Sequence, residues 1–297
     1  MEDVIRYINS NKANYIEELK DFLKIPSIST LAENKGDMLE AANFLVKKFD
    51  EAKMENAKII ETKGHPLVYA DWLHAPGKAT ILIYGHYDVQ PVDPIDLWDS
   101  PPFEPTIKGE NIYARGATDD KGQMYMHVKS VEAFLKTVGK LPLNIKFIIE
   151  GEEEIGSGNL EEFVNKNQDM LKCDAVMISD TSLYGPGIPT LTYGLRGICY
   201  MEVTVRGPNR DLHSGTFGGG VDNPINVLAE MISKLKDSNG KIKIPRFYDD
   251  VIKLTKKERE NFKKLPFSEK QYAKTLGVKE LNGEKGYTTL ERVWAAF

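Results

Sequence analysis

The 297-residue sequence contains only two cysteines, Cys173 and Cys199, and no long run of hydrophobic residues. So few cysteines exclude a disulfide scaffold, and no second Cys or His lies near either one to complete a zinc-binding pair. The mean hydropathy of −0.38 and the lack of long apolar runs exclude a membrane span. Residues 1–6 lack the apolar core of a signal peptide, so we expect a cytoplasmic protein.

Positive charge is not in excess either. The chain has 39 Lys and Arg residues against 44 Asp and Glu residues, which gives a net charge of −5. This balance offers no electrostatic basis for binding nucleic acid. The stretch Lys253–Lys264 mixes both signs and predicts an exposed helix rather than a basic patch. The 41% hydrophobic content suffices for a sizeable core, and the length predicts more than one domain.

Helical and strand-like segments alternate along the first part of the chain. An amphipathic pattern at residues 8–23 predicts a helix that ends before Pro26, and a second helix is predicted at Met38–Ala52. Such alternation favours an α/β fold with a mainly parallel sheet sandwiched by helices, whose ligands gather at one edge. The predicted segments that follow are Thr80–Tyr84, Lys121–Thr137, Leu143–Ile149, Leu160–Asn165 and Ala175–Ile178.

The pattern changes near Tyr193 and Gly194. Beyond this point the sequence predicts a strand at Cys199–Arg206, a glycine-rich turn at residues 218–220 and a helix at Pro224–Lys236. We therefore expect two domains, residues 1–192 and residues 193–297, the second being a smaller α+β domain.

The segment 84–91 places an imidazole, His86, two residues before a carboxylate, Asp88, directly after a predicted strand. At the end of a strand, His86 can bind a metal while Asp88 accepts the other ring N–H and fixes the tautomer. Alone, this short pattern is more typical of an ordinary loop.

Three more acidic positions follow apolar segments: Asp119–Asp120, Glu152–Glu154 and Asp180. Each has an ordinary alternative, since the aspartate pair could cap the next helix and the glutamates could form a charged turn. Together, at the ends of several strands, the carboxylates repel one another unless cations neutralise them. A pair of divalent ions would do so, and a histidine with several carboxylates suits zinc, manganese or cobalt.

Seven motifs in this order resemble the carnosinase-like cytosolic dipeptidases. These enzymes belong to the dinuclear zinc hydrolases, which also include aminoacylases, acetylornithine deacetylases, succinyl-diaminopimelate desuccinylases and glutamate carboxypeptidases. The resemblance runs from Phe22 onward and implies a catalytic domain up to residue 192, then the start of a lid and dimerisation domain. It also implies a small peptide substrate and a homodimer. The motifs are GHYDVQP, WDSPPF, RGATDDKG, EGEEEIGS, ISD, TYGLRGI and DLHSGTFGG.

The resemblance implies a set of metal ligands for two divalent ions, most simply zinc. His86 and Asp180 would bind the first ion, Glu154 would bind the second, and Asp119 would bridge both. The peptide bond between Asp119 and Asp120 would be cis.

The resemblance also implies roles beside the metals. Glu153 would be the general base that activates water, and Asp88 would orient His86. His213 would reach from the lid into a partner's active site and support the developing oxyanion, although a simple turn histidine is the alternative. We expect Glu152 to be structural. The remaining histidines, His65, His74 and His127, are expected to be loop, packed or surface residues.

One departure from the family concerns its last metal ligand, a histidine that follows the lid. No histidine follows His213 in this sequence, which ends at Phe297. We therefore expect a C-terminally truncated dipeptidase whose second ion has only Asp119 and Glu154, and low activity. The alternatives are an N-acyl-amino-acid deacylase on the same scaffold and a non-catalytic remnant that binds one metal or dimerises.

Overall fold

The computed structural model describes residues 1–185, 187–192, 194–195 and 197–292. The chain divides into two compact units, Met1–Leu191 and Thr192–Phe297. Tyr193, at the expected change of pattern, and the terminal Phe297 lie outside the described residues. None of the helices in the described ranges is long and apolar enough to cross a membrane.

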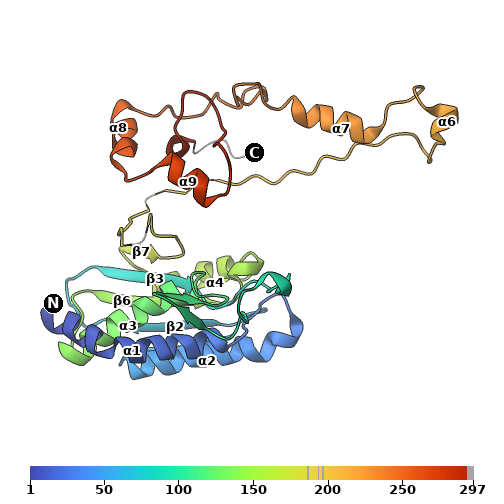
Figure 1. The fold of residues 1–297 in the computed structure, drawn as a ribbon. Helices are drawn as coiled ribbons and strands as arrows, with labels where there is room; N and C mark the ends of the chain where they lie inside the picture. The colour runs from blue at the N-terminus through green and yellow to red at the C-terminus, as the bar shows by residue number, and fades with distance from the viewer. Residues whose placement is uncertain (186, 193, 196, 293–297) are drawn as a thin grey trace. The chain divides into compact units, whose positions relative to one another are not determined.

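The first unit is built on a five-stranded sheet (Figure 1). Strand β3 pairs in parallel with β6 and β7, whereas β2 pairs antiparallel with β1 and β6. Only β2 therefore runs against the other four strands, and the expected mainly parallel sheet is confirmed. The strands lie in the order β1 (Glu55–Ile60), β2 (Leu67–Trp72), β6 (Asn144–Glu150), β3 (Thr80–His86) and β7 (Ala175–Ile178).

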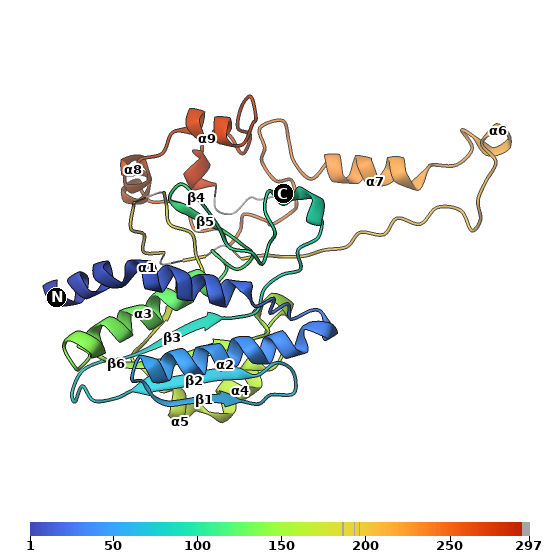
Figure 2. The same ribbon diagram turned by 60° about the horizontal axis from the view of Figure 1, so that its bottom comes forward.

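Helices cover both faces of this sheet (Figures 1 and 2). Alternate side chains of the strands point to opposite faces. Val68 and Ala70 belong to the larger core beneath α1, α2 and α3, while Leu67 and Tyr69 belong to a smaller core beneath α4 and α5. The bounds are α1 Glu2–Lys24, α2 Lys35–Glu51, α3 Lys121–Thr137, α4 Leu160–Lys166 and α5 Gln168–Leu171. A separate hairpin joins β4 (Thr106–Lys108) to β5 (Asn111–Tyr113), and short 3-10 turns occur at Ala32–Asn34, Ile95–Leu97 and Glu153–Ile155.

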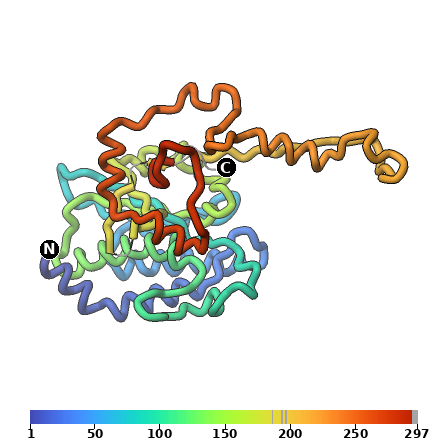
Figure 3. The backbone as a smooth tube through the Cα atoms, turned by 45° about the horizontal axis from the view of Figure 1, so that its top comes forward, coloured from blue at the N-terminus to red at the C-terminus, as the bar shows by residue number. Residues whose placement is uncertain are grey.

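The second unit contains short helices along its described residues. The segment Cys199–Arg206 is extended without being a strand, so this prediction is wrong. A strand needs a neighbour for its backbone N–H and C=O groups, and the described part of this unit offers it none. The chain then turns at α6 and leads back along α7 (Figure 3). The bounds are α6 Ser214–Phe217, α7 Pro224–Ser233, α8 Lys256–Lys264, α9 Glu269–Thr275 and a 3-10 turn at Thr289–Glu291.

A buried lysine joins the end of α1 to the start of α3. Lys121 is fully buried, and its Nζ donates hydrogen bonds to the carbonyl oxygens of Phe22 at 3.2 Å and Ile25 at 2.8 Å. Burial lowers the pKa of Lys121 to about 7. The ammonium has three N–H donors and the neutral amine has two, so either form can satisfy both carbonyls. The contact fixes the beginning of α3, directly after Asp119 and Asp120.

We expect Lys121→Met to lower the free energy of unfolding by about 2–4 kcal/mol, because it keeps the side-chain volume but removes both hydrogen bonds. Urea denaturation of the 297-residue chain measures this loss. The exposed Lys136, in the last turn of the same helix, provides the control Lys136→Met. Equal stability of the two variants would contradict the assigned contact.

Candidate metal centre

The candidate site lies at the edge of the sheet where β3, β6 and β7 end. His86 is the last residue of β3 and pairs in register with Glu150, the last residue of β6. Asp180 follows the end of β7 by two residues. Asp119 and Asp120 directly precede α3 and are joined by a cis peptide bond, as the resemblance implies. Because parallel strands end at the same edge, the sheet gathers motifs that are distant in sequence.

The buried imidazole of His86 lies at the centre of this site. Its Nε2 is 3.1 Å from Oδ1 of Asp119 and 3.6 Å from Oδ2 of Asp180. Its Nδ1 is 3.1 Å from the carbonyl oxygen of Asp88 and 3.4 Å from Oδ1 of the same residue. A proton on Nδ1 can donate to that carbonyl oxygen, so Nε2 can offer its lone pair to a metal ion that replaces its own proton.

The charges of the site favour a cation beside His86. Burial disfavours the protonated ring, but the hydrogen bond with Asp88 and the charges of Asp88, Asp120 and Glu153 raise the pKa of His86 to about 10. Burial raises the pKa of Asp120 to about 7. Burial and nearby carboxylates also raise the pKa values of Glu153 and Glu154. Several carboxylates thus surround a single imidazole and repel one another, and a metal ion would relieve this repulsion.

Two overlapping groups of side chains have the spacing of metal ligands. In each group the ligand atoms lie within 4.8 Å of one another. The first group is His86 with Asp119 and Asp180, and the second is His86 with Glu153 and Glu154. An imidazole with two carboxylates suits zinc, and manganese and cobalt accept the same donors. The structure thus brings six of the seven candidate residues, Asp88 included, to one edge of the sheet.

The carboxylate of Asp88 connects the two groups. Its Oδ1 accepts the backbone N–H of Glu153 at 3.2 Å, and its Oδ2 accepts that of Glu154 at 3.0 Å. The same residue contacts Nδ1 of His86. The side chain of Glu154 is held further by Gln90, whose Nε2 donates to it at 2.7 Å. Sequence reasoning assigned Asp88 to His86 alone and missed Gln90, because both contacts depend on how the loops fold.

Glu152 belongs to neither ligand group. Its carboxylate accepts hydrogen bonds from the backbone N–H of His65 at 3.2 Å and from Nδ2 of Asn159 at 2.7 Å. These contacts tie the loop after β6 to the loop before β2 and the start of α4. The structural role expected for Glu152 agrees with them.

His213 belongs to the second unit. Its Nδ1 accepts a hydrogen bond from the backbone N–H of Gly215 at 3.1 Å, and the residue caps the short helix α6. This is a turn contact within one unit. The role of His213 towards an active site stays a prediction.

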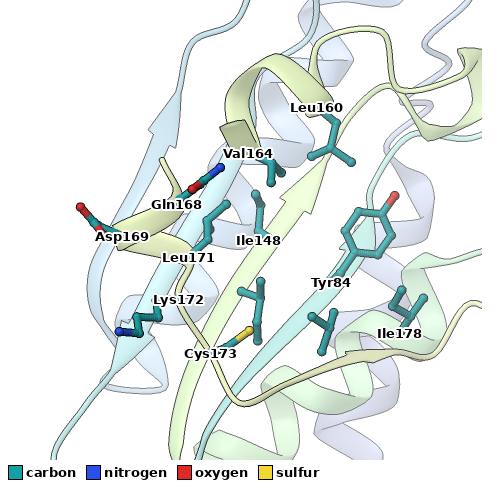
Figure 4. A pocket seen from close by; sticks show the side chains of 12 residues that line it. Tyr84, Ile148, Leu160, Val164, Gln168, Asp169, Leu171, Lys172, Cys173 and Ile178 are labelled. Atoms are coloured by element: carbon teal, nitrogen blue, oxygen red, sulfur yellow. The ribbon is translucent and has the colours of Figure 1, made fainter. Parts of the chain in front are cut away.

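An apolar cavity of about 800 Å³ lies on the sheet face covered by α4 and α5 (Figure 4). Tyr84, Ile148 and Leu160 are among the side chains that line it.

The hydroxyl of Tyr84 donates to Glu150 at 2.5 Å, and Ser157 donates to the same carboxylate oxygen at 2.9 Å. These contacts satisfy the buried Glu150 at the end of β6, which therefore supports the site rather than joining either ligand group.

Residues 82–287 match Peptidase family M20/M25/M40. The chain belongs to this peptidase family, in agreement with the resemblance carried by its motifs.

Individual relatives agree with this assignment. The chain is 35% identical to the Cys-Gly metallodipeptidase of Schizosaccharomyces pombe, over 94% of this chain and 61% of the relative. It is 33% identical to the human Beta-Ala-His dipeptidase, over 99% and 61% of the two chains. The structure of a metallo-carboxypeptidase from Sulfolobus solfataricus matches with a TM-score of 0.74 and 38% identity, over 94% of this chain and 62% of the other. Human carnosine dipeptidase 1 matches with a TM-score of 0.76 and 31% identity, over 94% and 62%. The chain thus spans about three fifths of these relatives.

We expect Asp88→Asn to lower the pKa of His86 in the chelator-treated chain by about one to three pH units, because the substitution removes the negative charge beside the ring. The raised pKa means that protonated His86 stabilises the fold below about pH 6.5, and that this contribution disappears as the pH rises through about 10. In Asp88→Asn, the stabilisation of the fold by protonated His86 should be lost at a lower pH than in the wild type. NMR titration of the imidazole measures the shift, with the exposed Asp96→Asn as control. An unchanged His86 pKa would show that Asp88 does not control this ring.

Proposed function

We propose that this chain provides the metal centre of a dipeptide hydrolase in which Glu153 is the general base. One observation supports this most directly. This chain belongs to the peptidase family, and the ligand atoms of its His86, Asp119 and Asp180 lie within 4.8 Å of one another. The charge of the site points the same way, because the carboxylates outnumber the one imidazole that they surround.

We assign the ligands as follows. His86 and Asp180 would hold the first divalent ion, Glu154 would hold the second, and Asp119 would be shared by both. The donor set of one neutral imidazole nitrogen and carboxylate oxygens fits zinc, with manganese and cobalt as alternatives. When bound, such ions lower the pKa of a water molecule and polarise the scissile carbonyl group.

Glu153 is the residue that moves the proton in this proposal. Burial and the neighbouring carboxylates raise its pKa, which makes it a stronger base than an ordinary glutamate. It accepts a proton from the attacking water and passes the proton to the leaving amine nitrogen. Asp88 holds the backbone of Glu153 while it contacts His86, so base and ligand keep their separation.

The substrate class follows from the relatives. Their names describe the hydrolysis of Cys-Gly and of Beta-Ala-His, so we propose small dipeptides for this chain. His213 would support the developing oxyanion from the lid of a partner in a homodimer. An N-acyl-amino-acid deacylase would use the same ligands and differ in what the lid recognises.

We expect the protein supplied with zinc or manganese to hydrolyse Cys-Gly, Beta-Ala-His or alanine-containing dipeptides at a low rate, in preference to N-acetyl amino acids. Glu153→Gln should lower turnover by about 10²–10⁴-fold, because the amide cannot accept the proton. Release of the amino acid products measures turnover, and elemental analysis measures the metal content, which should stay near that of the wild type.

The matched variant Glu154→Gln distinguishes the two neighbouring glutamates. It should lose metal along with activity. The opposite result, with metal lost in Glu153→Gln, would exchange the two roles. Preference for N-acetyl amino acids would favour the deacylase. Inactivity on both substrate classes with metal still bound would favour a non-catalytic remnant.

We expect the 297-residue chain to retain one zinc ion per chain after dialysis. The first site has three protein ligands, one of them an imidazole oriented by Asp88, whereas Asp119 and Glu154 alone make a weak, solvated site. Calorimetric titration, with elemental analysis of the dialysed protein, measures the two affinities. Two tightly held ions would reveal a further ligand, and Glu153, within reach of His86 and Glu154, is the first to test by substitution.

A further inference from the structure

His127 contacts the loop that carries a candidate ligand. Its Nε2 lies 2.6 Å from Oγ of Ser179, the residue directly before Asp180. The sequence places His127 within an ordinary helical pattern, so we expected a packed or surface residue. The structure instead shows a half-buried side chain in a hydrogen bond with a residue 52 positions away.

One helix thereby reaches two ligands of the same group. Asp119 lies two residues before the first residue of α3, and His127 lies on α3 seven residues after Asp120. Seven residues are about two helical turns, so His127 faces the same side as the start of the helix. The start of α3 is itself fixed by Lys121, which donates to the end of α1. Helix α3 therefore sets the position of Asp119 directly. Through His127 it also contacts Ser179, the residue that precedes Asp180.

The segment that carries Asp180 has little other support. Strand β7 is four residues long, lies at the edge of the sheet and has exposed side chains. Thr181 donates a local hydrogen bond to the carbonyl oxygen of Ser179 at 2.7 Å. Within the described residues, the hydrogen bonds and ion pairs that join Ser179–Thr181 to other elements are the bond to His127 and the approach of Asp180 to His86. Asp180 also lies within 4.8 Å of Asp119. The His127 contact does not involve the ligands themselves, so it can hold the loop in place before an ion binds.

We propose that His127 is a positioning residue, which holds Asp180 in place for the first metal ion through its hydrogen bond to Ser179. This inference rests on the metal centre proposed above. Burial lowers the pKa of His127, so the ring is neutral at physiological pH and adds no positive charge to compete with the ion. A lysine in this place would fix the loop but would also offer Asp180 a cation of its own.

The hydrogen bond can be removed from either side. We expect His127→Phe, which keeps the ring volume, and Ser179→Ala each to weaken zinc binding at the tight site by about 10–100-fold. The double variant should lose no more than the larger single loss, because both substitutions remove one bond. His127→Gln should restore most of the affinity, since its amide nitrogen can occupy the place of Nε2. Ser130→Ala is the control, because Ser130 lies on the same helix and donates to Met126 at 2.9 Å.

Competition with a chromophoric chelator measures the zinc affinity, and the absorption of bound cobalt reports the ligand geometry. Thermal denaturation of the chelator-treated variants measures any loss of fold separately. Unchanged affinity and an unchanged cobalt spectrum in Ser179→Ala would overturn the positioning role while the metal centre stands. Additive losses in the double variant would also overturn it. A wild-type chain that binds no zinc would overturn the metal centre and, with it, this inference.

Discussion

The sheet brings several carboxylates close together, and the need to offset their mutual repulsion is the constraint on the whole site. Parallel strands end at one edge, and here β3 ends in His86 while Asp180 follows β7. The start of α3 adds Asp119 and Asp120 to the same place. Burial and mutual repulsion raise the pKa of several of these groups. A fold that tolerates such a cluster must offset its charge, and divalent cations offset it most completely.

Much of the fold could be predicted because local pattern and tertiary structure agree in the first unit. The bounds of α3 and β7 match the predicted segments. The order of strands could not be predicted, because β2 lies between β1 and β6 through pairing of distant segments. The failed strand at Cys199–Arg206 has the same physical origin. Its residues favour an extended backbone, but a strand exists only beside another strand.

The candidate site shows the same division. Motifs directly after strands located the group around His86, since topology decides where strand ends meet. Residues that contact these ligands or their neighbours have no sequence motif that would reveal such a contact. The sequence analysis gave Gln90, Glu150 and His127 no role at the site, because their partners lie 64, 66 and 52 residues away along the chain. A histidine on a helix carries no mark in its sequence that separates a packed side chain from one that holds a loop.

The shared position of Asp88 has a thermodynamic consequence. Its carboxylate contacts His86 and also accepts the backbone N–H groups of Glu153 and Glu154. If a bound ion drew His86 towards Asp119, it would also shift the carboxylate on which the other group depends. The two proposed ion-binding events would then be linked, and by reciprocity each would change the affinity of the other by the same factor. Occupation of the tight first site would thus change the affinity of the weak second site, with Asp88 as the residue that couples the two.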